Sequence, residues 1–133
     1  MQREDNLKHK MKILQRKKEA GEEIREEDKV RVAVLADSPT VMTGFGNVCR
    51  EILDMLYKTE FYTFDVVGIN YDGKPHTFPY RIWPAVNGLM MEPAYRDVFG
   101  RQQFLDLLGS GTHDIVWVLQ DSFIVEEIGR AHV

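Results

Sequence analysis

This 133-residue chain has little cysteine, no long apolar run and no apolar leader. It has one cysteine, Cys49, which excludes an internal disulfide framework and a zinc cluster built from several cysteines. No apolar run approaches the roughly 18 residues that a membrane-spanning helix needs. The amino-terminal residues are charged from Arg3 onward and contain no apolar segment of the kind that a secretory signal requires. These absences predict a cytoplasmic protein without a membrane span.

The chain also lacks an excess of basic charge outside its first 29 residues. Residues 1–29 hold nine Lys and Arg against eight Asp and Glu, whereas the remaining 104 residues hold eight against thirteen. Nucleic-acid binding that does not depend on sequence requires a basic surface. The acidic balance of the larger part therefore predicts no nucleic-acid partner. A hydrophobic content of 44% is enough for a real core.

The first 29 residues form a separate, highly charged tract. Leu7, Met11 and Leu14 recur at helical spacing, and we expect a solvated or frayed helix that lies outside the core. The basic cluster of this tract is followed at once by acidic residues. We therefore interpret it as a solvated face rather than as a contact for a membrane surface or nucleic acid. Its members are Lys8, Lys10, Lys12, Arg16, Lys17 and Lys18.

Strand and helix patterns alternate from residue 30 onward. The nearly continuous apolar run at 30–36 suits a central parallel strand that is buried on both faces. This alternation predicts an α/β class, Rossmann-like three-layer domain with a mainly parallel sheet. The further strands are expected at 64–70, 78–83 and 115–119, and the helices at 47–58 and 100–108. The first of these helices is expected to bury Val48, Ile52, Met55 and Leu56.

Two glycines, Gly44 and Gly46, lie between the first strand and the first helix. Glycines allow a ligand to approach the backbone, and the start of a helix offers unpaired N–H groups and a positive dipole end. A dinucleotide-binding fingerprint would need Gly or Ala at position 49, where Cys49 stands, and no Gly-Lys-Ser/Thr of a P-loop is present. The segment therefore predicts a ligand site of another kind, with glycines that only shape a turn as the alternative.

The segment ADSPTVMTGFGNVCREIL, residues 36–53, resembles the first βα unit of GT-B glycosyltransferases. The resemblance is strongest to the large retaining family that includes glycogen- and sucrose-type synthases. In those enzymes a glycine-rich loop after the first strand lines the cleft between two Rossmann-like domains. Arg50 resembles a residue in the first turn of the following helix. The resemblance assigns substrate or donor contact to Thr43, Gly44, Phe45, Gly46 and Asn47.

The resemblance covers residues 29–127, about two-thirds of an N-terminal domain, and includes the later stretch HDIVWVLQD. It implies transfer of a sugar from a nucleotide-sugar donor to an acceptor, with no cofactor and no metal, since no Asp-x-Asp motif is present. The family binds the donor mostly through a C-terminal domain with a Glu-x7-Glu pair, which is missing from this sequence. Glu19 and Glu27 have that spacing, but they lie in the charged tract and we interpret the match as coincidence. In the family a departing diphosphate is stabilised by positive groups and a helix dipole.

Polar residues after the strands are the other candidate ligand contacts. Asp37 and Ser38 end the first strand. Asp121 and Ser122 follow the last one, where capping of a further helix is the alternative role. His76, in the loop after the second strand, is a candidate contact for a sugar acceptor, with an ordinary exposed loop histidine as the alternative. No metal site is predicted.

Four other side chains are interpreted as structural. His113 precedes its strand and so lies at the far edge of the sheet, while Cys49 and Trp117 are expected to pack in the core. Trp83 is assigned to packing, with stacking on a sugar as the alternative.

The end of the chain carries a further prediction. Residues 128–133, IGRAHV, match the translation of a widely used sequencing-adapter oligonucleotide. We expect them to be an artefact and the natural protein to continue, with a genuine terminus as the alternative. The predicted organisation is thus a charged extension at 1–29, an incomplete glycosyltransferase domain at 30–127 and this tail. The rival function is a stand-alone Rossmann-like or flavodoxin-like binding or regulatory domain without catalysis.

Overall fold

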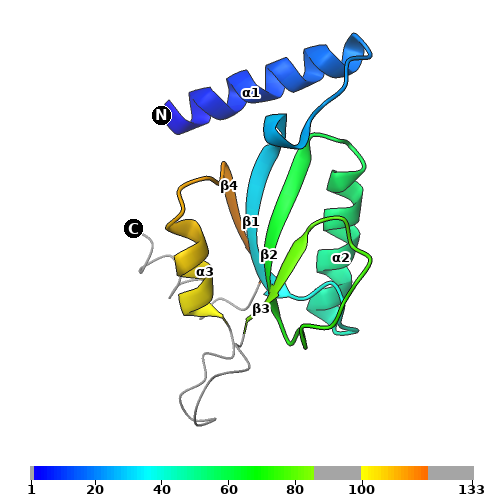
Figure 1. Ribbon diagram of the computed structural model, residues 1–133, viewed down its shortest axis with the longest axis vertical. Coiled ribbons are helices and arrows are strands. Elements are labelled where there is room, and N and C mark those ends of the chain that lie inside the picture. The colour runs from blue at the N-terminus through cyan, green and yellow to red at the C-terminus, as the bar shows by residue number, and fades with distance from the viewer. Residues whose placement is uncertain (1, 86–99, 120–133) are drawn as a thin grey trace.

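The chain, described by a computed structural model over residues 2–85 and 100–119, folds as an α/β domain in three layers (Figure 1). Its four strands form one parallel sheet in the order β3-β2-β1-β4. Helix α2 packs on one face, α3 packs on the other, and α1 crosses the amino ends of the strands. The predicted Rossmann-like fold class is confirmed. The elements are α1 (Gln2–Glu19), a 3-10 turn η1 (Glu26–Asp28), β1 (Val30–Asp37), α2 (Gly44–Tyr57), β2 (Tyr62–Ile69), β3 (Arg81–Pro84), α3 (Arg101–Leu108) and β4 (Ile115–Leu119).

Strand β1 lies at the centre of the sheet, as its apolar run predicts. It pairs with β2 along its whole length and with β4 over residues 32–36. All of its residues except Arg31 are buried, because the strand has a neighbour on each side and a helix over each face. Within the described part of the chain β4 pairs only with β1. Its IVWVL run is therefore partly exposed, rather than buried as the sequence predicted.

Alternate residues of β1 point into two separate cores, because successive side chains of a strand lie on opposite faces. Val34 points to the face that α2 covers and shares a cluster with Leu53 of that helix. Leu35 points to the opposite face, where it shares a cluster with Phe104 of α3. We call these two faces the α2 face and the α3 face.

Helix α2 begins at Gly44, three residues before the predicted start, and the predicted stripe is buried only in part: Leu56 packs against the cluster of the α2 face and Ile52 is half-buried. Val48 and Met55 were expected inside, but their side chains are 43% and 62% exposed. The buried residues of the helix are Gly46, Cys49 and Leu53, at positions i, i+3 and i+7. Gly46 sets this rotation, because a Cβ atom there would lie 2.5 Å from the carbonyl oxygen of Val41 and only glycine allows the helix so close.

Helix α1 also differs from the prediction, because it is part of the core rather than a solvated extension. Leu14 is completely buried in the cluster of the α2 face, and Leu7 and Met11 pack against that cluster. The basic side chains of α1 reach back to the domain: Lys10 Nζ lies 2.9 Å from Asp114 Oδ2. Three apolar residues at helical spacing are thus enough to dock a charged helix, because long basic side chains cover apolar surface while their charged ends stay in water.

The aromatic residues before β3 do not belong to a strand, although their alternation predicted one from residue 78. Strand β3 begins at Arg81, after Pro79, and pairs only with β2 among the described strands. The rings of Phe78 and Tyr80 lie 5.7 Å apart, and that of Tyr80 lies 5.5 Å from Phe64. The rings of Phe78 and Tyr80 therefore pack in the core ahead of β3 and do not form part of the strand. No helix in the described ranges is long and apolar enough to cross a membrane.

Candidate functional site

The carboxyl ends of β1, β2 and β3 meet at one edge of the sheet, as parallel strands require (Figure 1). Ligands of open α/β sheets bind outside this edge, in the loops that follow the strands. Two loops meet here: residues 38–43, between β1 and α2, and residues 70–80, between β2 and β3. Most of the residues singled out in the sequence lie in these two loops or in the first turn of α2.

A chain of hydrogen bonds joins the end of β1 to the start of α2. Asp37, the last residue of β1, is 8% exposed, and its Oδ2 accepts a 2.6 Å hydrogen bond from the Thr43 hydroxyl. Thr43 is the N-cap of α2 and its hydroxyl oxygen accepts the backbone N–H of Gly46 at 2.9 Å. The Thr43 carbonyl accepts the N–H of Asn47 at 2.9 Å. This cap leaves the first two N–H groups of α2, those of Gly44 and Phe45, for other acceptors.

Ser38 lies inside the loop and does not reach the surface. Its side chain is fully buried, and its Oγ lies 2.7 Å from the Thr40 hydroxyl and accepts the Thr40 N–H at 3.2 Å. A Cβ atom at Gly68 of β2 would lie 2.8 Å from the Ser38 Cβ. In this arrangement Ser38 shapes the loop at a point where loop and strand are in close contact, and only glycine fits opposite it.

An open hollow of about 490 Å³ lies where the loop enters α2, lined by Asp37, Thr43, Gly44, Phe45 and Val48. Phe45 is 45% exposed, and a Cβ atom at Gly44 would meet no other atom within 4 Å. The hollow therefore brings together a carboxylate, the start of a helix and an exposed aromatic ring. The predicted contacts Thr43, Gly44 and Phe45 come together here.

Asn47 and Arg50 lie beside this hollow and bind each other. Arg50 Nη2 donates a 2.6 Å hydrogen bond to Asn47 Oδ1, and its Nη1 donates one of 3.2 Å to the carbonyl oxygen of Pro39. The guanidinium group thus fixes the helix to the loop that precedes it. Asn47 supports the loop through this contact.

His76 lines a second hollow, of about 420 Å³, together with Thr40 and Val41 of the first loop. Its Nδ1 accepts the backbone N–H of Phe78 at 3.1 Å, and its ring packs against the rings of Tyr71 and Phe78 at 6.0 and 5.7 Å. In the neutral ring the proton is therefore on Nε2. His76 is held in a fixed orientation beside the glycine loop, unlike a free surface histidine.

Two of the four side chains that were interpreted as structural, Cys49 and Trp117, are packed against the core in the structure. Cys49 is completely buried, and desolvation, together with the nearby Asp37 and Asp54 carboxylates, raises the pKa of its thiol to about 12. Trp117 packs partly buried against the cluster of the α2 face, and Trp83 lies on the α3 face beside Leu107. Asp121 and Ser122 lie outside the described residues.

His113 lies at the amino edge of the sheet, as predicted, and belongs to a charged cluster that sequence analysis missed. Its Nε2 is 2.6 Å from Asp65 Oδ2, and Arg31 Nη2 is 3.2 Å from the same oxygen. The side chains of His113 and Asp65 are only 4% and 13% exposed. The available signal was an aspartate at the second position of FDVVGIN, a strand that is otherwise apolar up to Ile69.

Among residues 2–85 and 100–119, no three His, Cys, Asp or Glu side chains gather as a metal ion would require. Comparison of the chain with protein-family models, with curated proteins and with solved structures finds no match in any of the three. The function therefore has to be argued from the geometry of the site and from the resemblance of its glycine loop.

Proposed function

We propose that the carboxyl edge of the sheet is the acceptor side of a glycosyltransferase site, in a protein that transfers a sugar from a nucleotide-sugar to an acceptor. One observation carries the proposal. Asp37, Gly44 and the exposed Phe45 line one hollow at the start of α2, where the N–H groups of Gly44 and Phe45 have no acceptor among the residues that the structure describes. A carboxylate accepts hydrogen bonds from hydroxyl groups, backbone N–H groups donate to them, and an aromatic ring offers a flat apolar face. A sugar ring presents the complement of all three.

The groups of this hollow suit a hydroxylated ligand. The N-terminus of α2 has no acidic residue in its first turn, and the Asp37 carboxylate lies beside its cap. A sugar hydroxyl can donate a hydrogen bond to a carboxylate oxygen and accept one from a helix N–H.

His76 lines the other hollow at the carboxyl edge, and we propose it as a separate contact for the acceptor. Because its Nδ1 is occupied by the Phe78 N–H, the neutral ring offers only Nε2–H, a hydrogen-bond donor. It is therefore suited to hold an acceptor hydroxyl oxygen and is not suited, in this tautomer, to remove its proton. Its role is positioning rather than general-base catalysis.

The donor is proposed to bind mainly elsewhere. The resemblance implies that most donor contacts belong to a second domain, so this chain by itself should bind sugars weakly and transfer none. We expect dissociation constants of about 1–10 mM for a sugar at the carboxyl edge, corresponding to roughly 3–4 kcal/mol.

Titration of the chain with glucose, maltotriose, UDP-glucose and GDP-mannose, followed by the backbone amide resonances, tests the proposal. Saturable shifts are expected at Gly44, Phe45 and His76. Gly44→Ala should remove them without loss of stability, because its new methyl group enters open space in the fold but occupies the hollow. Gly109→Ala, at the far end of the domain in helical conformation, is the matched control.

Two results would overturn the proposal. One is the absence of a saturable shift at the carboxyl edge with all four probes, which is what the rival non-catalytic regulatory domain predicts. The other is a response that Gly44→Ala leaves unchanged, since the backbone approach would then play no part.

A further inference from the structure

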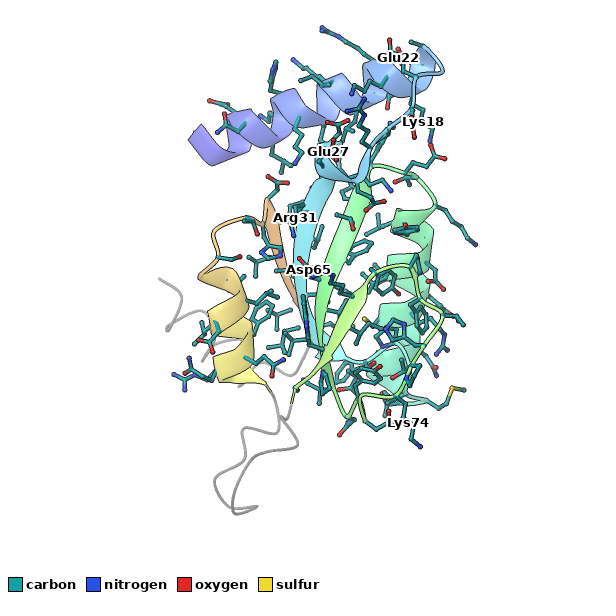
Figure 2. All side chains as sticks on the ribbon, viewed as in Figure 1. Lys18, Glu22, Glu27, Arg31, Asp65 and Lys74 are labelled. Carbon is teal, nitrogen blue, oxygen red and sulfur yellow. The ribbon has the colours of Figure 1, made fainter. Side chains whose placement is uncertain are left out.

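The α3 face of the sheet is divided into an apolar half and a polar half. The apolar half, toward the carboxyl ends, is covered by α3. The other half, toward the amino ends, carries polar side chains from three neighbouring strands, at positions that alternate with those facing α2. Figure 2 shows Arg31 and Asp65 there, beside Glu27 and below α1. The polar residues are Arg31 of β1, Thr63 and Asp65 of β2, and Arg81 of β3.

This half is hollowed. An open cavity of about 450 Å³ is lined by these four residues, by Glu26 and Glu27, and by the segment before β3. Cavities of roughly 300–1,000 Å³ hold small molecules. Parallel sheets normally carry apolar side chains on both faces because helices cover both. The polar half therefore departs from what the fold itself requires.

Each carboxylate of the cavity has a cationic partner within the described structure. Glu26 Oε1 lies 2.7 Å from Lys29 Nζ, and Glu27 Oε1 lies 3.6 Å from an Arg25 nitrogen. Asp65 Oδ2 is bound by both Arg31 and His113, at 3.2 and 2.6 Å.

Arg81 has no such partner. Its guanidinium group makes no ion pair or side-chain hydrogen bond with any of the residues that the structure describes, and it is exposed next to Asp65 in the strand register. The one uncompensated charge of the cavity is therefore positive. A guanidinium group presents a planar fork of donors that matches the oxygens of a phosphate or a carboxylate.

A polar ligand fits this half-face better than a packed helix does. Covering the cavity with an apolar surface would remove Arg31, Asp65 and Arg81 from water, and the cost of desolvating such groups can exceed what their pairing returns. A small anion leaves them hydrated in part and supplies the missing charge.

We propose that this cavity binds the phosphate or carboxylate group of a small molecule, held by Arg81 with assistance from the free donors of Arg31 and the Thr63 hydroxyl. The site lies at the opposite end of the strands from the carboxyl edge and does not depend on the function proposed there.

Titration of the chain with inorganic phosphate and, separately, with acetate tests the site, with sodium chloride at equal ionic strength as the reference. We expect saturable shifts of the backbone amides of Thr63, Asp65 and Arg81 with at least one of the two anions. The anion that saturates at the lower concentration shows which oxyanion the cavity prefers. Arg81→Gln should weaken the binding about tenfold or more, whereas Lys58→Gln, which removes one exposed positive charge on α2, should leave it unchanged.

A third variant makes the expectation more specific. Asp65→Asn keeps an oxygen for the His113 proton but removes the charge that occupies Arg31, so oxyanion binding should become tighter by severalfold. The proposal is overturned if neither anion saturates, if chloride gives the same shifts, or if Arg81→Gln and Lys58→Gln behave alike. Because Arg81 is exposed, its variant is expected to fold even if the Asp65 variant does not.

Discussion

The hydroxyl of Thr43 donates a 2.6 Å hydrogen bond to the carboxylate of Asp37 and at the same time accepts the backbone N–H of Gly46. One side chain thus connects the end of the central strand to the start of the helix beside the proposed sugar site. The geometry of the glycine loop depends on this connection.

Thr43→Val should lower the free energy of unfolding by about 1–2 kcal/mol, since it removes the helix cap and a hydrogen bond to a buried carboxylate. Thr43→Ser keeps the hydroxyl and should cost less than half as much. Urea denaturation of both variants gives the comparison. Equal stability of the valine variant and the parent chain would show that the cap does not hold the loop.

Leu14→Ala should destabilise the domain by about 2–5 kcal/mol, because Leu14 is completely buried in the cluster of the α2 face. Ile13, its neighbour in α1, is 39% exposed, and Ile13→Ala should change stability by no more than about 0.5 kcal/mol. Thermal or urea unfolding distinguishes the two. Similar small effects from both would mean that α1 is a solvated extension, as its composition predicted.

The sequence predicted the sheet well and the helix surfaces poorly, for a physical reason. A central parallel strand is apolar on both faces, so the run at 30–36 indicates its place whatever its rotation. A helix buries only one side, so predicting its buried residues requires its rotation about its own axis. Helix α2 has apolar residues on two stripes, and either could face the sheet. Gly46 decides between them through a contact with Val41 that no periodicity contains. In α1 three apolar residues recur at helical spacing, but the many charged residues around them predicted a solvated helix.

The fold is expected to lose stability in acid through Asp114. Desolvation alone would raise the pKa of this carboxyl. Two hydrogen bonds, from the backbone N–H of Arg31 and from the Lys10 ammonium group, together with the positive charge of Lys10, outweigh desolvation and hold the pKa below the ordinary value of 3.8. A carboxyl whose pKa is lowered in the folded state stabilises the fold above its unfolded pKa, and this contribution is lost as the pH falls through the folded pKa.

Asp114→Asn should therefore be less stable than the parent at about pH 7 and should lose less stability on going to about pH 2.5. Glu51→Gln, on the exposed surface of α2, should follow the parent at both values. The free energy of unfolding in urea at the two pH values checks this. A parallel decline in the parent and the Asp114 variant would contradict the assignment.

Cys49 should resist alkylation in the native protein. Its thiol is completely buried, and desolvation first and the Asp37 and Asp54 carboxylates second raise its pKa to about 12, so almost no thiolate is present near neutral pH. Iodoacetamide should label the native chain only as fast as it unfolds and should label it rapidly in concentrated urea. Complete labelling of the folded chain within minutes would show that α2 opens locally.

The candidate site was predictable in part. A glycine loop after an apolar strand indicates the carboxyl edge, and the resemblance assigned contacts there to Thr43, Gly44 and Phe45, which line one hollow. Ser38 and Asn47 have the right positions in the sequence, but the first shapes the loop and the second binds Arg50. The cluster of Arg31, Asp65 and His113 depends on strand register and on a contact between β2 and the residue before β4, which local patterns do not encode.

The position of β1 between β2 and β4 has a consequence for how the protein is made. β1 is the first strand to be synthesised, yet one of its two partners is the last described strand, and Arg31 and Asp114, which bond across that pairing, are 83 residues apart in sequence. Pairings of long sequence separation form late, after the entropy of closing the loop has been overcome. During translation β1 therefore has one unpaired edge until β4 has been synthesised. The nascent chain cannot complete the pairing of β1 with β4 until Leu119 has left the ribosome.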